Sequence, residues 1–77
     1  MAEQTRDGVI VLVQESRFQL EDREGRHQLF ILAHAAPLEP ADLEWLQRAE
    51  VPVRVVYDQA PDLIAAIAHD VRPADDP

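Results

Sequence analysis

Side chains able to perform covalent chemistry are almost missing from this 77-residue chain. Ser16 is the only serine and Thr5 the only threonine, and the chain has neither cysteine nor lysine. Nucleophilic catalysis needs a hydroxyl, thiol or amine activated by a neighbouring base. Ser16 precedes a predicted strand, where serine side chains commonly bond to nearby backbone. Only Gly8 and Gly25 are glycines, so no glycine-rich phosphate loop is present. We therefore expect a protein that is not an enzyme and that holds no cofactor.

Histidine and carboxylate side chains are the remaining candidates for chemistry. His27 and His34 are seven residues apart, an odd separation that places them on opposite faces of one strand, and His69 is followed by Asp70. This spacing predicts rim or surface histidines and no metal site. The carboxylates fall in predicted turns and loops without an apolar pocket to change their acidity, which predicts a solvated acidic surface. They are Glu21, Asp22, Glu24, Asp58 and Asp62.

The charge balance limits the classes of partner. Fifteen acidic residues face seven basic residues, all arginine, and give a formal net charge of −8. Such a surface repels polyanions, which disfavours nucleic acid and anionic membranes and favours a protein partner. No apolar run approaches the ~20 residues of a membrane span, and the first residues lack a signal-peptide core. We expect a cytoplasmic protein.

A hairpin lies at the centre of the predicted structure. Phe18 and Leu20 alternate with polar residues before the turn, and the segment 26–34 follows it. Gly25 suits the left-handed position after a type I turn over Arg23 and Glu24. Both faces of 26–34 are partly apolar, so the pattern leaves open whether Phe30, or Leu29 and Ile31, point outward.

The other elements follow from changes of period. The run that begins at Gly8 predicts a first strand, and a change of phase within 14–17 predicts a tight turn or bulge. Pro40, with Leu43 and Leu46 on one face, begins a short helix that ends before 51–52. Residues 51–57 alternate as a fourth strand, and 63–71 is interpreted as a fifth.

The element order predicts a mostly β protein, a small five-stranded OB-like Greek-key barrel with one short helix between the third and fourth strands. The alternative is a β-grasp sheet of order β-β-α-β-β, if the first two strands form one arm. We expect a single domain over residues 8–72, a disordered lead-in at 1–7 and a disordered acidic tail at 73–77.

This layout resembles the OB barrels of bacterial translation initiation factor one and related ribosomal RNA-binding domains. The resemblance covers most of the chain and rests on Gly8-Val9, on F-Q-L-E-D followed by Gly25, on Ala33-His34 and on the alternating valines at 51–55. It implies single-stranded RNA binding as a possible function, which is the alternative to protein–protein interaction through the barrel face or a strand edge.

The predicted binding face is built from the second and third strands, where OB domains take their ligands. Arginine and aromatic side chains there would stack on bases, whereas arginines paired with glutamates and a buried Phe30 would indicate an ordinary solvated sheet. Trp45 lies off the helical stripe and either packs over the barrel mouth or serves as an exposed anchor for a partner. The candidate binding residues are Arg17, Gln19, Arg26, Gln28, Phe30, Arg54 and Trp45.

Overall fold

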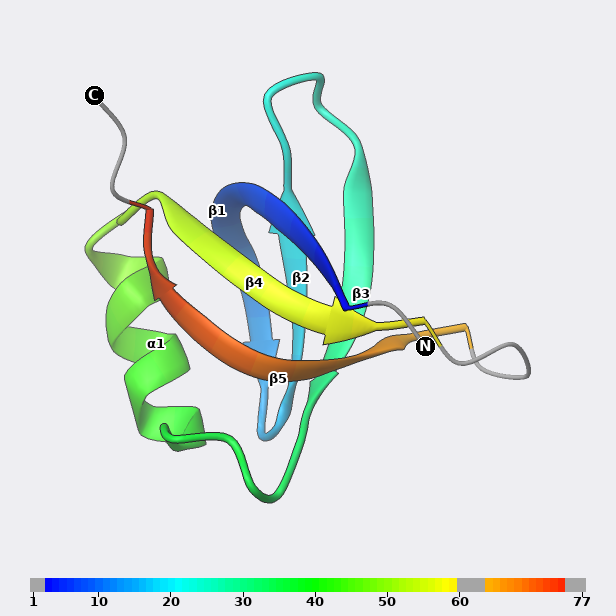
Figure 1. Cartoon of the computed structure of the whole chain (residues 1–77). Helices are drawn as coiled ribbons and strands as arrows, with labels where there is room; N and C mark the ends of the chain where they lie inside the picture. The colour runs from blue at the N-terminus through cyan, green and yellow to red at the C-terminus, as the bar shows by residue number, and fades with distance from the viewer. Residues whose placement is uncertain (1–2, 60–63, 75–77) are drawn as a thin grey trace.

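Five strands close into a barrel, and one helix lies across one of its ends (Figure 1). The computed structural model describes residues 3–59 and 64–74. The elements, in chain order, are β1 (Gln4–Gln14), β2 (Arg17–Glu21), β3 (His27–Leu32), α1 (Pro40–Arg48), β4 (Val53–Asp58) and β5 (Ala66–Pro73). The strands neighbour one another in the order β1-β2-β3-β5-β4, and β3 and β5 are parallel. The predicted OB-like barrel is confirmed, and the β-grasp alternative is wrong because β1 and β2 are separate strands of a closed barrel.

β1 is long enough to pair with two different strands. Its first half, Gln4 to Gly8, pairs with β4, and its second half, from Val9, pairs with β2. A register shift between Ile10 and Leu12 bends the strand further. The strand thus begins four residues before the predicted Gly8, and the expectation of a disordered lead-in is wrong for residues 4–7. Residues 1–2 lie outside the described part of the chain.

Two tight turns set the register of β1, β2 and β3. Glu15, with φ at 57°, turns the chain from β1 into β2, as the predicted change of phase requires. In the next turn the Gly25 N–H donates to the Asp22 carbonyl at 3.0 Å. Gly25 has φ at 80°, the left-handed conformation expected for it. Both turns predicted from the sequence are confirmed.

α1 is fastened at its start and at its buried face. Pro40 occupies the first turn, and the Asp42 carboxylate accepts a hydrogen bond from the Glu39 N–H at 2.8 Å. Leu43 and Leu46 are buried, as their spacing predicts. The Gln47 side chain donates to the Val11 carbonyl at 3.0 Å, which ties the helix to β1. No helix in the described part of the chain is long and apolar enough to cross a membrane.

The core is the inside of the barrel. Phe30 stacks on Phe18 with ring centroids 5.3 Å apart and meets the edge of Tyr57 at 5.1 Å. Small residues of β5, Ala66 and Ala68, are fully buried and pair with Phe30 and Tyr57 of the neighbouring strands. The Tyr57 hydroxyl lies 3.0 Å from the Gln4 side-chain oxygen, to which it donates. Alanines beside the large rings are suited to close packing inside a narrow barrel.

β5 confirms the fifth strand interpreted from an alanine-rich segment, although it begins at Ala66 and continues to Pro73. Leu63, where the predicted strand began, lies outside the described residues. Beyond the strand, the Ala74 N–H donates to the Pro52 carbonyl at 2.8 Å, so residues 73–74 are ordered and the predicted disordered tail is wrong for them. Residues 75–77 of that tail also lie outside the described residues.

Candidate interaction surface

Two rows of outward side chains cross the sheet on the side formed by β1, β2, β3 and β5. In the first row, Leu12 pairs with Gln19, which pairs with Leu29. In the second row, Gln14 pairs with Arg17, Arg17 with Ile31, and Ile31 with Ile67. Paired residues in a sheet point to the same side. We call this surface the outer face, and its residues are Leu12, Gln14, Arg17, Gln19, Leu29, Ile31 and Ile67.

The outer face is mainly aliphatic. Leu12 is 44 % exposed, and Leu29, Ile31 and Ile67 are half-buried, each flanked in its strand by a fully or nearly fully buried residue. Gln19 lies between Leu12 and Leu29, and Arg17 lies beside Ile31. An aliphatic surface with a few polar groups is suited to contact with another protein surface.

Phe30 is not on this surface, which corrects its place among the candidate binding residues. It is 0 % exposed at the centre of the aromatic cluster. The side chains of Leu29 and Ile31, which flank Phe30 in β3, therefore face outward, because successive residues of a strand alternate in direction. Phe30 stacks on protein rings and cannot stack on a nucleobase without opening the barrel.

A groove continues the outer face beyond the end of β3. It has a volume of about 600 Å³, and its lining includes Ile31 and Ile67 from the outer face. Leu38 and Pro40, from the segment that leads into α1, also line it. Ser16, His34 and Glu39 supply its polar groups. The aliphatic surface thus leads into a concave site, the usual shape of a ligand-binding surface.

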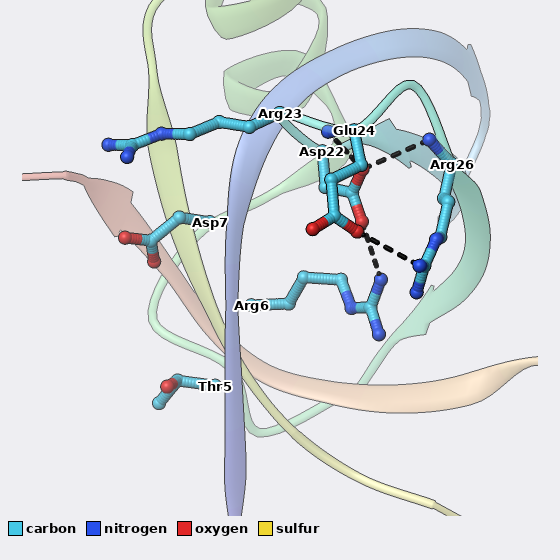
Figure 2. Close-up of a pocket in the computed structure, with 7 residues that line it drawn as sticks. All are labelled: Thr5, Arg6, Asp7, Asp22, Arg23, Glu24 and Arg26. Atoms are coloured by element: carbon cyan, nitrogen blue, oxygen red, sulfur yellow. Dashed lines mark hydrogen bonds and ion pairs between the residues drawn. The ribbon is translucent and has the colours of Figure 1, made fainter.

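Two of the candidate arginines are held in ion pairs elsewhere. Figure 2 shows Asp22 and Glu24 lying between Arg6 and the hairpin residue Arg26, in a hollow of about 450 Å³. The Arg6 guanidinium lies 3.0 Å from Asp22, and the Arg26 guanidinium lies 3.1 Å from Glu24. Arg54 binds Asp7 through two parallel contacts of 2.8 Å. Three arginines, Arg6, Arg23 and Arg26, and three carboxylates, Asp7, Asp22 and Glu24, line the hollow, so its lining carries no net positive charge.

Hydrogen bonds to the two aspartates change their acidity. The backbone N–H of Arg26 holds the pKa of the Asp22 carboxyl below its usual range, assisted by the Glu24 N–H and the Arg6 charge and opposed by partial burial. The hydrogen bond from Arg54 lowers the pKa of Asp7 in the same direction, again against desolvation. Both carboxylates stabilise the fold in their charged form. Asp22 also shapes the hairpin turn, because its oxygen accepts from the Glu24 and Arg26 N–H groups.

The remaining candidate residues lie apart from one another. Arg17 and Gln19 belong to the outer face, and Arg17 makes no ion pair with any described residue. Gln28 is on the inward side of β3, at the barrel rim, where its side chain lies 3.5 Å from that of Gln59. Trp45 is 58 % exposed on α1, so it does not pack over the barrel mouth. Of the seven residues predicted from the sequence, only Arg17 and Gln19 share the outer face.

The histidines are dispersed among ordinary partners. His69 lies 2.7 Å from Asp58 across the β4–β5 pair, and His27 lies 3.8 Å from Glu21 across β2–β3. His34 is at the edge of the groove. Within residues 3–59 and 64–74, no group of three or more histidine, aspartate or glutamate side chains is arranged to hold a metal ion.

The candidate binding residues predicted from the sequence included none of the four aliphatic residues of the outer face: the outward direction of Leu29 and Ile31 was left open, and Leu12 and Ile67 were not considered. Two of them belong to 26–34, where both faces of the strand are apolar and alternation cannot tell inside from outside. The only signal in the sequence was the alternation in β2, which places Gln19 outward. This alternation identifies the rest of the outer face only when the register of β2 with β1 and β3 is known, and that register is a property of the folded sheet.

Comparisons with known proteins add no relative to this description. No protein-family model matches the chain, no curated protein matches it, and no solved structure matches it.

Proposed function

We propose that this protein is a non-catalytic binding module whose partner is another protein, docked on the outer face. The observation that carries the proposal is the register that aligns Leu12 with Leu29 across Gln19 and sets Ile31 beside Ile67. Exposed aliphatic surface is costly in water unless a partner covers it. The four side chains come from β1, β3 and β5 and lie on one side of the sheet, with Gln19 of β2 between Leu12 and Leu29.

The distribution of charge supports a protein partner over single-stranded RNA. RNA binding through this sheet needs arginines that are free to neutralise phosphates and an aromatic ring that accepts a base. Of the three candidate arginines, Arg26 and Arg54 are paired with acidic side chains and only Arg17 makes no ion pair with a described residue, and Phe30 is buried. With a net charge of −8, the chain repels phosphates at long range.

The direct test uses two variants that remove a large apolar side chain from different surfaces. Leu29→Gln changes the outer face, and Trp45→Ser changes the exposed surface of α1. The full chain, immobilised, is used to capture proteins from the cells that produce it. We expect a partner retained by wild type and by Trp45→Ser and lost with Leu29→Gln. Amide spectra of both variants establish that the barrel is folded.

Two results would contradict the proposal. Equal capture of the partner by wild type and by Leu29→Gln would show that the outer face takes no part in the interaction. The second experiment titrates labelled protein with a mixed single-stranded oligonucleotide at low and at physiological salt. We expect no shifts at Arg17 and Gln19. Shifts there that fade as salt rises would establish nucleic-acid binding instead, because phosphate contacts release counterions.

A further inference from the structure

The groove at the end of the outer face combines aliphatic sides with an acidic edge. Its aliphatic lining includes Ile31, Ile67, Leu38 and Pro40, around a space of about 600 Å³. This volume lies within the range of roughly 300–1,000 Å³ typical of ligand sites. The sides offer contact to an aliphatic side chain but few polar groups. Hydrogen-bonding capacity is concentrated at the edge, in Ser16, His34 and Glu39.

Two carboxylates near the groove make no ion pair with any described residue. Glu39 lines the groove, and Glu15 immediately precedes its lining residue Ser16. Of the other described acidic residues, six have a basic or histidine partner within ion-pair distance: Asp7, Asp22, Glu21, Glu24, Asp58 and Asp70. Glu3, Asp42, Glu44 and Glu50 make no ion pair with a described residue either, but none of them lines the groove. An occupant that carries a cation beside its aliphatic side chain would complement Glu39.

The charge of the whole chain argues against a second copy as the occupant. Two copies, each with a formal charge of −8, repel one another as they approach. The same field attracts a basic segment and increases its rate of association. The side chain of Glu39 also takes part in the capping box of α1, but its exposed carboxylate makes no ion pair with a described residue, so net charge and Glu39 favour the same class of occupant.

We propose that this groove binds a segment of the partner protein in which an aliphatic side chain is adjacent to arginine or lysine. The aliphatic side chain lies between Ile31 and Leu38, and the cation contacts Glu39. This inference deepens the proposed function and rests on it, since the groove is the concave end of the outer face. The partner's contact with the outer face then depends on burial of apolar surface, whereas its contact with the polar groups of the groove depends on charge.

The test selects peptides from a random displayed library on the immobilised full chain. We expect enrichment of sequences with leucine, isoleucine or valine next to arginine or lysine. A selected peptide is then titrated into labelled protein, where the amides of Ile31, Ile67 and Leu38 should shift. Glu39→Gln should lower the affinity for that peptide about two- to fivefold, which is the effect of losing one exposed ion pair. The matched control Glu44→Gln removes an exposed carboxylate from α1 and should leave the affinity unchanged.

The outcomes separate this inference from the proposed function. Peptides that bind equally to wild type and Glu39→Gln, or shifts confined to other residues, would overturn the inference. So would a dimer of the wild-type chain that Ile31→Ser dissociates, because a second copy would then occupy the groove. None of these results changes the capture experiment with Leu29→Gln, which tests the outer face independently.

Discussion

Gly8 of β1 lies against the backbone of Glu21 in β2, so close that a Cβ at Gly8 would be 2.3 Å from the Glu21 carbonyl oxygen. Gly8 is also the last residue of β1 that pairs with β4, and Val9, the next residue of β1, is the first that pairs with β2. The chain therefore turns the corner of the barrel at a position where the neighbouring strand leaves no room for a side chain.

We predict that Gly8→Ala destabilises the barrel by about 1–3 kcal/mol, because a backbone carbonyl cannot move aside as a flexible side chain can. Urea unfolding of the two proteins measures the difference. Gly25→Asn is the control glycine substitution: asparagine tolerates a positive φ, and a Cβ there meets only the Glu21 side chain at 4.0 Å. A Gly8→Ala variant as stable as wild type would show that β1 and β2 are not packed in this way.

Neighbouring residues of β3 should respond differently to truncation. Phe30→Ala removes a ring that contacts Phe18 and Tyr57 and should cost about 3–5 kcal/mol. Leu29→Ala, on the half-buried outer face, should cost about 1 kcal/mol. Thermal or urea unfolding compares them. A larger loss of stability for Leu29→Ala than for Phe30→Ala would mean that Leu29, and not Phe30, points into the barrel. The outer face would then not exist as described.

Acid should weaken the attachment of β1 to β4. The pKa of Asp7 is lowered in the folded protein by its hydrogen bond with Arg54. Its contribution is therefore complete above the unfolded pKa of about 3.8 and is lost as the pH falls through the lower folded value. We predict that Asp7→Asn is less stable than wild type at pH 7 and that the difference narrows below pH ~4. Urea unfolding across this range measures it.

Asp22 provides a second case with the same sign, since its pKa is also lowered. The Asp22→Asn variant should likewise be less stable than wild type at pH 7, and this difference should narrow in acid.

The exposed carboxylate of Glu44, which makes no ion pair with a described residue, gives the control variant Glu44→Gln for both substitutions. Should the Asp7→Asn and Glu44→Gln proteins show the same dependence on pH, the Asp7–Arg54 pair would contribute nothing to stability in solution.

α1 offers a matched pair of substitutions on its two sides. Trp45 is 58 % exposed, whereas Leu46 is 7 % exposed. We predict that Trp45→Ala changes the free energy of unfolding by no more than about 0.5 kcal/mol, and that Leu46→Ala costs about 2–5 kcal/mol. In the native protein a soluble quencher should reach the Trp45 fluorescence readily. A shielded Trp45 would mean that the helix packs on the barrel in another orientation.

The sequence alone determined the order of elements, the turn at Gly25 and the buried stripe of α1. These are local properties: a glycine that accepts a positive φ, a proline that begins a helix, and leucines at helical spacing. The barrel itself could be inferred because three strands, a helix and two strands form a recognised order. Alternation in β2 was equally clear, since Phe18 and Leu20 are separated by polar residues.

The tertiary structure decided where the strands pair and which of their residues reach the surface. Residues 4–7 look unstructured in the sequence because their side chains are polar, yet they pair with β4 through the backbone, which composition does not reveal. Both faces of β3 are aliphatic or aromatic, so burial of Phe30 rather than Ile31 followed from registration against Phe18 and β5. The candidate arginines are separated for the same reason: Arg54 binds Asp7 of the neighbouring strand β1, although the two residues are 47 positions apart in the chain. Register joins residues that are distant in sequence, and for this reason the outer face belongs to the folded barrel and not to any one of its segments.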